Sequence, residues 1–511
     1  MTPMTQSTRG SWIARSAAVL ALSVSVAACE SLLEVELPGQ VTEDATFVPA
    51  QARLLVNSAI ADIECALSDF TAFEAAGNED NTTRTVGWWG SRFERPVTPN
   101  GGQCSTGETS VGWFSPLHKG RWMAEQVYTK LQNDWTGVAD REELMGTAAL
   151  YAGLAYTHFG EFFCEVTADA GPLMTWQESL AKGEQWFTDA LTHIQAAGDY
   201  SIATGVTTSA QQMAYLLRAR ARIAQNTPAK LAEAALDAAQ IQQGFTSSVT
   251  RESGGERTRW NRVYSAHVGL GWVILLGPVD WWSGTSSNMP ALLGGGAWPA
   301  VIPFTGYWDL AILADGRAVS DTGYPITLAD ASTPADSTAD PRVLAVPSSV
   351  GGVGGGGGPY NYPQLEQAKY TSQGDDFPLA KWEEAWLIQA QAAGGATAIT
   401  LVNEIRAAHS LPQITGAYLT SLTDGTNDAS EIQIMLLEEI RRSHYLESGR
   451  WWSTKLRYDL WFPRGEGVDR WNFGYQTGVR MVFPNGEFTA NPNLDEADQG
   501  SGCAPNQNPV V

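Results

Sequence analysis

The sequence predicts a mainly α-helical protein, in which a framework of paired helices (an α-solenoid) carries one large loop-rich insertion. Apolar residues recur at helical spacing over residues 50–243 and again over 379–461, as in helices that bury one face. The stretch between them, 244–378, is rich in Gly, Ser, Thr, Pro and Trp and has no sustained helical period. A structureless stretch of that length inside a domain is usually a functional insertion.

The composition excludes one class of partner. The chain has 511 residues, 43% of them hydrophobic, so most of it can bury a core, and the length alone allows several domains. Its formal net charge is -23, with 32 Lys and Arg against 55 Asp and Glu. Because so acidic a surface repels phosphate backbones, we expect no nucleic-acid partner.

Residues 1–28 have the features of a bacterial export signal. Arg9 and Arg15 precede an apolar run over 16–28, which suits a signal peptide and is too short for a membrane anchor. The run ends in small residues directly before Cys29, an arrangement that resembles the lipobox of bacterial lipoproteins. This resemblance implies cleavage before Cys29, its lipidation, and a tether over 29–49. The alternative is an ordinary signal peptide followed by an incidental cysteine.

Four further cysteines, Cys65, Cys104, Cys164 and Cys503, allow two disulfides in an exported chain, and the sequence leaves three pairings open. We favour Cys65 with Cys104 and Cys164 with Cys503, since the second bond would join the irregular tail, 462–511, to the body. The chain has no CxxC pair or CxxH cluster, so we expect no structural zinc site, and we assign no residue as a metal ligand.

The first helical region, 50–243, contains six predicted helices, separated by Gly, Pro, Ser or Thr: 50–67, 122–131, 142–163, 179–194, 210–225 and 228–241. Pro228 sits at the first position of the last one, where its missing N–H matters little. A loop over 69–110 follows the first helix.

Helices resume at residue 379. A helix with Trp382, Ala385 and Trp386 on one face is followed by a Gly394-Gly395 turn, a second helix and a stop at Pro412. Two helices, a tight turn and a terminal proline over roughly 34 residues are typical of one tetratricopeptide (TPR) unit. We therefore predict a TPR-like framework, with the N-terminal helix pairs as more degenerate copies.

The stretch RRSHYLESGRWWSTKLRYDLW, residues 441–461, raises the question of what the pair Trp451-Trp452 does. Two adjacent indoles can form a flat platform for a sugar ring, or they can close the hydrophobic core of a helical domain. The preceding segment, 431–446, is an amphipathic helix that ends at Gly449. Tryptophans directly after a helix end usually pack on its last turn, so we favour the structural role.

This stretch closely resembles the C-terminal signature of the SusD-like (RagB/SusD) nutrient-binding outer-membrane lipoproteins. The segments CESLLEVELPGQVTEDATF, TAALYAGLAYTHFGEFF, MAYLLRARARIA, DPRV, AKY and EEAWLIQAQA are similar to family segments in the same order, so the resemblance spans residues 29–461. Tyr151 and Ser453 depart from it, since the family usually has Arg and Asp there. The signature positions are Glu438, Glu439, Arg441, Arg442, Tyr445, Glu447, Gly449, Arg450 and Trp451.

The resemblance implies a non-catalytic lipoprotein at the cell outer membrane that binds a glycan, or in some branches a peptide, as a lid over a SusC-type TonB-dependent transporter. Glu30, Glu34 and Glu36 directly follow Cys29 and resemble the surface-export signal of some lipoproteins, which favours an exterior location. In the family, ligand contacts come from the loops after the first helix and from the middle insertion.

Two segments of this chain have the residue types for that contact. A sugar stacks its C–H face on an indole, and its hydroxyls need fixed donors and acceptors such as Asn, Asp and Arg. The first segment, 77–94, combines both; the second lies in the insertion, among small polar residues. A packed surface turn is the alternative for each. The candidate ligand-binding residues are Asp80, Asn81, Arg84, Trp88, Trp89, Arg92, Trp281, Trp282, Tyr307 and Trp308.

Signatures of catalysis are absent from the sequence. It contains no HExxH, no phosphate-binding glycine loop with its Lys and no Gly-x-Ser-x-Gly elbow, so we expect no enzyme activity and no cofactor. Two further alternatives remain open: a lipid-anchored glycoside hydrolase whose carboxylates come from distant segments, and a TPR-like scaffold without a small ligand. Calcium binding by the Asp- and Asn-rich loops is left undecided.

Overall fold

The computed structural model has two units, Met1–Gln51 and Ala52–Val511. Of the first unit it describes residues 46–51, including the short helix η1 (Pro49–Gln51), so Cys29 and the signal peptide lie outside the described residues. No helix in the described part of the chain has the length and apolar character needed to cross a membrane. The described residues of the second unit are 52–77, 81–83, 113–203, 205–254, 256–268, 276–278, 310–312, 318–320, 341–342, 345–347, 365–367, 369–411, 413–414, 431–458, 480–481 and 484–495.

The second unit is mainly helical, which confirms the predicted fold class. Its helices are α3 (Ala52–Gly77), α4 (Phe114–Asn133), α5 (Arg141–Phe162), α6 (Trp176–Ala197), α7 (Ala210–Ala224), α8 (Pro228–Ala238), η3 (Arg257–Arg259), α9 (Arg262–Val268), α12 (Trp382–Ala393), α13 (Gly395–Ala408), α15 (Glu431–Ser443), α16 (Arg450–Tyr458) and α17 (Asn485–Ala490).

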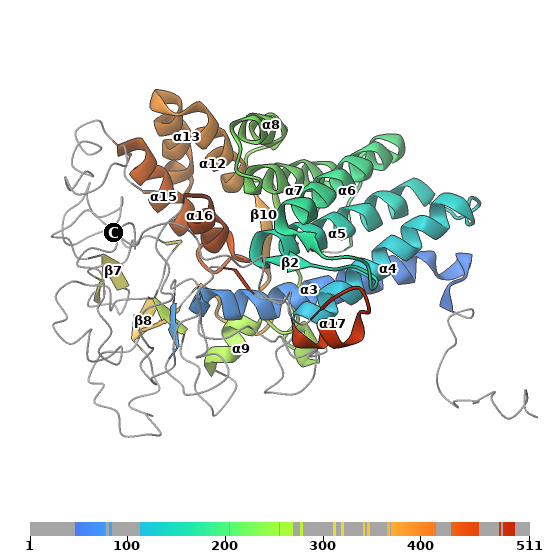
Figure 1. Ribbon diagram of the computed structural model, residues 1–511. Coiled ribbons are helices and arrows are strands. Elements are labelled where there is room, and N and C mark those ends of the chain that lie inside the picture. Colours follow the sequence, from blue (N-terminus) through green and yellow to red (C-terminus); the bar gives the residue numbers. More distant parts are fainter. Residues whose placement is uncertain are drawn as a thin grey trace, which may run out of the picture. The chain divides into compact units, whose positions relative to one another are not determined.

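The helices form a row in which each packs on the next: α3 on α4, and so on to α8 (Figure 1). The next helix of the row is α12, which packs on α8 although Ala238 and Trp382 are 144 residues apart in sequence. Helix α13 packs on α12, and α15 lies against both. The helical framework therefore continues across the insertion.

Glycines set the close contact between α5 and α6. A Cβ at Gly153 would lie 2.8 Å from the ring of Phe187, and one at Gly160 would lie 2.8 Å from the backbone oxygen of Trp176. From the other side, a Cβ at Gly183 would lie 3.0 Å from the backbone oxygen of Gly153. Side chains at these positions would push the two helices apart, so the absence of a Cβ lets the backbones approach.

The strands of the described residues form two-stranded antiparallel sheets. Strand β4 (Thr246–Val249) pairs with β10 (Phe377–Lys381), so two strands at the ends of the predicted insertion lie side by side at its base. The other pairs are β1 (Asn81–Thr83) with β5 (Leu276–Pro278), β2 (Glu165–Val166) with β3 (Met174–Thr175), β6 (Leu310–Ile312) with β7 (Ala318–Ser320), and β8 (Ala345–Pro347) with β9 (Leu365–Gln367).

Several boundaries differ from those read from the sequence. Helix α3 runs to Gly77, so residues 69–77, predicted as loop, are helical. Helix α4 begins at Phe114, not at residue 122, because Pro116 is tolerated in a first helical turn and Gly120 packs against Ile63 of α3. The Trp pair begins a further helix, α16, where the sequence predicted only a segment after a helix end.

Several of the sequence segments that carry the resemblance meet at buried ion pairs. Glu439 accepts hydrogen bonds from Arg342 at 2.6 Å and from Arg406 at 2.8 Å. Glu447 accepts hydrogen bonds from Lys369 at 2.6 Å and from Lys381 at 2.8 Å. The motifs DPRV and AKY are therefore held to the C-terminal helices by charge.

Trp451 and Trp452 are each only 2% exposed, which confirms their structural role. Trp452 stacks on Phe70 with ring centroids 6.4 Å apart and meets Phe162 edge-on at 5.8 Å. Gly449 turns the chain between α15 and α16 with φ +76°, and a Cβ there would lie 2.4 Å from the ring of Phe162. Only glycine fits this turn, because both the conformation and the space exclude a side chain.

The tail contains a short helix, α17, and its described residues dock on the connection between α5 and α6. Met481 pairs with Phe163 in a parallel bridge, and Asn491 donates hydrogen bonds to Thr167 and to the backbone oxygen of Gly171. Both cysteines of the body are disulfide-bonded: Cys65 and Cys164. Cys104 and Cys503 lie outside the described residues, so the preferred pairing stays a prediction.

Candidate functional site

Most of the predicted ligand-binding residues lie outside the described residues. The backbone of Asn81 is described, as the first residue of β1. The others are Asp80, Arg84, Trp88, Trp89, Arg92, Trp281, Trp282, Tyr307 and Trp308. The site is therefore built from the elements that carry these segments.

The two segments predicted to bind a sugar are joined by a β-pair. Strand β1 lies in the first segment, and β5 ends three residues before Trp281 of the second. Asn81 is opposite Pro278 and Thr83 is opposite Leu276, in antiparallel register. The pairing brings together parts of the chain that are nearly 200 residues apart, which the sequence did not reveal.

The C-terminal half of α3 supports this pair with a buried polar face. Asp69 accepts a hydrogen bond from Nε of Arg262 at 2.9 Å, and Ser68 accepts one from the backbone N–H of the same arginine at 3.2 Å. Arg262 is the first residue of α9, and α9 packs on β5. These contacts fix the start of α9, and through it they position β5.

A second buried charge cluster lies one turn earlier on α3. Glu64 is 1% exposed; its Oε2 accepts a hydrogen bond from Thr250 at 3.0 Å and lies 3.4 Å from both Arg251 and Arg259. Burial raises the pKa of Glu64, and the two arginines and Thr250 oppose that rise. Burial likewise lowers the pKa of Arg251 to about 10, so Arg251 keeps its charge at neutral pH.

The segment directly before β10 is hydrogen-bonded to the same region. Asn261 donates a side-chain hydrogen bond to the backbone oxygen of Asp375 at 2.8 Å, and its own N–H reaches the backbone oxygen of Gln373 at 2.7 Å. Asp376 accepts a hydrogen bond from the backbone N–H of Arg251. Together with the β4–β10 pair, these bonds make the base of the insertion a cross-linked structure continuous with α3.

Reasoning from the sequence did not single out Glu64, Asp69, Arg251 or Arg262. One signal was available, because Glu64 and Ser68 lie four positions apart and so share a face of α3, and Asp69 is the next residue. Their arginine partners come from a region without periodicity, nearly 200 residues away, and no sequence pattern links the two.

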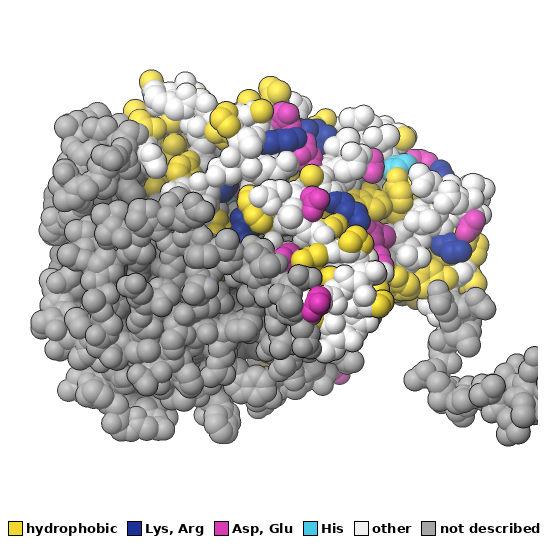
Figure 2. Space-filling model, viewed as in Figure 1, with side chains coloured by type: hydrophobic (Ala, Val, Ile, Leu, Met, Phe, Trp, Pro, Cys, Tyr) yellow, Lys and Arg dark blue, Asp and Glu magenta, His cyan; other side chains and the backbone are white. Residues whose placement is uncertain are grey.

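The visible framework surface carries paired charges. Figure 2 shows Lys and Arg side chains beside Asp and Glu side chains over the region of α6 to α8. Glu184 contacts Arg222 at 2.9 Å and Lys230 at 2.8 Å, and Asp237 contacts Arg218 at 2.7 Å. These contacts join three consecutive helices and leave little unbalanced charge on this face.

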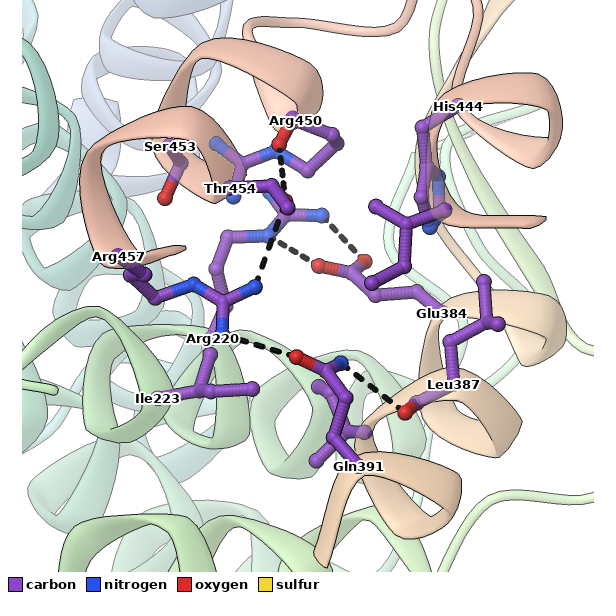
Figure 3. A pocket seen from close by; sticks show the side chains of 12 residues that line it. Arg220, Ile223, Glu384, Leu387, Gln391, His444, Arg450, Ser453, Thr454 and Arg457 are labelled. Atoms are coloured by element: carbon purple, nitrogen blue, oxygen red, sulfur yellow. Dashed lines mark hydrogen bonds and ion pairs between the residues drawn. The ribbon is translucent and has the colours of Figure 1, made fainter. Parts of the chain in front are cut away.

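One cavity lies inside the framework, where α7, α12, α15 and α16 meet (Figure 3). Its volume is about 30 Å³, which is room for one or two water-sized occupants. It cannot admit a sugar ring, so the candidate ligand site remains at the β1–β5 pair. Among the described residues, no group of three or more His, Cys, Asp or Glu is arranged to hold a metal ion.

Solved structures identify the fold. A SusD-like carbohydrate-binding protein from Bacteroides vulgatus matches with a TM-score of 0.55 and 13% identity, over 89% of this chain and 98% of that one. Surface glycan-binding protein A from Bacteroides uniformis matches with a TM-score of 0.53 and 14% identity, over 89% and 100%. Its namesake from Bacteroides thetaiotaomicron, in complex with laminarihexaose, matches with 0.51 and 11%, over 87% and 98%. No family model and no curated protein matches the sequence.

The chain therefore has the SusD-like fold. The resemblance carried by the C-terminal signature is confirmed at the level of the fold. The match covers 98–100% of those two structures and 89% of this chain.

Proposed function

We propose that this protein is a surface-exposed outer-membrane lipoprotein, anchored through Cys29, that binds an oligomeric glycan and passes it to a SusC-type TonB-dependent transporter. It binds without converting its ligand. The observation that carries the proposal is the β1–β5 pair, because it joins the first segment, with its Trp, Asn, Asp and Arg, to a strand that directly precedes the aromatic residues of the second.

Chain connectivity strengthens this reading. Trp281 follows Pro278 by three residues, so it can lie at most about 11 Å from the end of β5. Asp80 and Arg84 flank β1 directly. We therefore expect polar groups of the first segment and an indole of the second to contact the same oligosaccharide. The similar fold of a protein solved with laminarihexaose supports the same ligand class.

Binding is tested by isothermal titration of the mature protein with a panel of oligosaccharides, laminarihexaose included, and a matched panel of oligopeptides. We expect heat only with an oligosaccharide. Heat only with peptides would reject the glycan and favour the peptide-binding branch of the fold. Release of shorter sugars during long incubation would show a hydrolase and reject the non-catalytic role.

The site is tested by Trp88→Ala and Trp281→Ala. Each is expected to weaken binding at least about tenfold, equivalent to 1.4 kcal/mol, because each removes a stacking surface. Trp386→Ala is the matched control, since Trp386 lies on framework helix α12 and its indole donates to Glu404. Unchanged affinity in the Trp88 and Trp281 variants would remove the site from these segments.

Anchoring and delivery need separate measurements. Cys29→Ser is expected to abolish incorporation of a labelled fatty acid and to release the protein from the outer-membrane fraction. The wild-type protein is expected to co-purify with a SusC-type transporter in mild detergent. Full membrane retention of Cys29→Ser would contradict the lipid anchor.

A further inference from the structure

Arg457, in the last turn of α16, differs from its arginine neighbours because it forms no ion pair with any described residue. It donates hydrogen bonds to Oε1 of Gln391 at 2.9 Å and to Oγ1 of Thr454 at 3.3 Å, both neutral oxygens. No carboxylate in the described part of the chain lies within ion-pair distance of it, and its Nε is buried without a hydrogen-bond partner.

The neighbouring arginines are fully matched with carboxylates. Arg450 makes a two-pronged contact with Glu161 at 2.8 and 2.6 Å, and Arg220 makes one with Glu384 at 2.7 and 2.6 Å. Each of these pairs is neutral overall. Among the residues that the structure describes, the charge of Arg457 is therefore in excess around the cavity that all three arginines line.

The cavity leaves space for a small occupant beside the guanidinium of Arg457. Figure 3 shows the guanidinium of Arg457 at the cavity wall, with Gln391 beside it and Glu384 turned towards Arg220. Ile223, Leu387 and Ile440 supply apolar parts of the wall. Arg457 is partly buried, and this burial lowers its pKa, because loss of solvent disfavours the cation. An arginine nevertheless stays protonated at neutral pH, so it needs a counterion.

We propose that this cavity binds one small monovalent anion of the size of chloride, held by the guanidinium of Arg457. The 30 Å³ volume excludes phosphate esters and sugars but accommodates one such ion. Its occupant would contact elements from both sides of the insertion, α7 before it and α12, α15 and α16 after it. The site is distinct from the glycan site and does not depend on the proposed function.

A water molecule is the competing occupant. Water can satisfy the donor at Nε but cannot balance the charge, so it would make stability independent of which anion is present. Anion binding couples to folding instead: an ion that binds only the folded state raises the unfolding midpoint as its concentration increases.

The first test locates the ion. Crystals of the mature protein grown or soaked in sodium bromide are expected to show an anomalous peak within hydrogen-bonding distance of Arg457. Absence of a peak at about 500 mM bromide overturns the proposal, since an ion that binds usefully would occupy the site at that concentration. This test uses the wild-type protein and does not depend on a variant that folds.

The second test measures linkage. Replacing gluconate by chloride at constant ionic strength, about 500 mM, is expected to raise the midpoint of thermal unfolding by roughly 2 °C. Two variants that each lower the charge at the cavity by one should abolish the shift. Arg457→Gln removes the cation, and the near-isosteric Gln391→Glu places a carboxylate where the Arg457 partner is now an amide.

Arg53→Gln serves as the control, because Arg53 is an exposed arginine of α3 and should keep the full chloride response. An equal chloride shift in wild type, Arg457→Gln and Gln391→Glu would show a general salt effect and overturn the proposal. Loss of the shift in both variants, with retention in Arg53→Gln, is the expected result.

Discussion

Arg450 donates two hydrogen bonds, of 2.8 and 2.6 Å, to the carboxylate of Glu161, which lies 289 residues earlier in the sequence. The pair joins the start of α16 to the end of α5, and Ser453 donates a third hydrogen bond to the same carboxylate at 2.8 Å. The arginine of the C-terminal signature thus closes the helical framework on its N-terminal half.

Removing the charge of Glu161 should destabilise the whole framework. Glu161→Gln removes the carboxylate that pairs with buried Arg450, and we expect a loss of about 3–5 kcal/mol in the free energy of unfolding, measured by urea denaturation. Asp140→Asn is the control, because Asp140 pairs with Arg53 where both side chains are more than half exposed. There the loss should stay below about 1 kcal/mol. Similar losses in the two variants would contradict the role of the buried pair.

The glycine contact between α5 and α6 predicts a steric effect. Gly153→Ala places a methyl group 2.8 Å from the ring of Phe187 and should lower the unfolding free energy by about 1–3 kcal/mol. Gly137→Ala, in a turn with nothing within 4 Å of the new Cβ, should change it by less than about 0.5 kcal/mol. Thermal unfolding of both variants provides the comparison, and a fully stable Gly153→Ala would mean that the helices can separate freely.

His158 should make stability depend on pH. Its side chain is buried between Phe70 and Phe162; burial first, and then Arg450 and Arg220, hold its pKa well below 6.5. Below pH 6.5 the unfolded chain therefore binds a proton that the folded chain does not, and folding stability falls as pH falls. The contribution reaches about 1.4 kcal/mol per pH unit.

His158→Phe keeps an aromatic ring in that position and should remove this part of the pH dependence. Urea unfolding of both proteins at pH 7.5, 6.5 and 5.5 measures it. We expect the stability difference between wild type and variant to shift in favour of the variant as the pH falls. Parallel curves would show that His158 does not titrate in this window.

Asp69 should control the order of the ligand segment. Asp69→Asn weakens the bond to Arg262 at the start of α9, so hydrogen exchange over 262–268 and 276–278 should become about 10- to 100-fold faster. Oligosaccharide affinity should fall with it, because the binding-competent arrangement becomes less populated. Asp62→Asn on the same helix, whose partner Lys119 is exposed, should leave that exchange unchanged. Unchanged exchange in Asp69→Asn would separate α9 from the site.

Much of the helical fold could be predicted from the sequence, because the apolar spacing and end signals of a helix involve residues close together in the chain. The Gly394-Gly395 turn and the apolar spacing of α12 and α13 predicted a helical hairpin, and the structure has one there. The start of α4 was predicted eight residues too late, because Pro116 and Gly120 are residue types that often mark a helix end. The close contact of Gly120 with Ile63 explains the glycine. A prediction from local sequence fails where the size of a residue is set by its contact with another helix.

The candidate site was predictable only as two separate segments. Residue type alone marked Asn81 and Trp281 as suited to a sugar, since stacking and hydrogen bonding need those side chains. That their segments meet, through β1 and β5, depends on a pairing between distant parts of the chain. The buried residues Glu64 and Asp69 were not predicted for the same reason, because an ion pair between distant residues produces no repeating pattern in the sequence.

By itself the sequence determined the helical class and the structural role of Trp451, since the spacing of apolar residues and the signals for helix ends depend on residues close together in the chain. Tertiary structure decided that α12 continues the row after α8 and that Arg450 reaches Glu161. It also decided that Arg457 lies at a cavity where, among the described residues, no carboxylate pairs with it. Those outcomes depend on which side chains the folded chain brings together, and chain neighbours alone do not fix that.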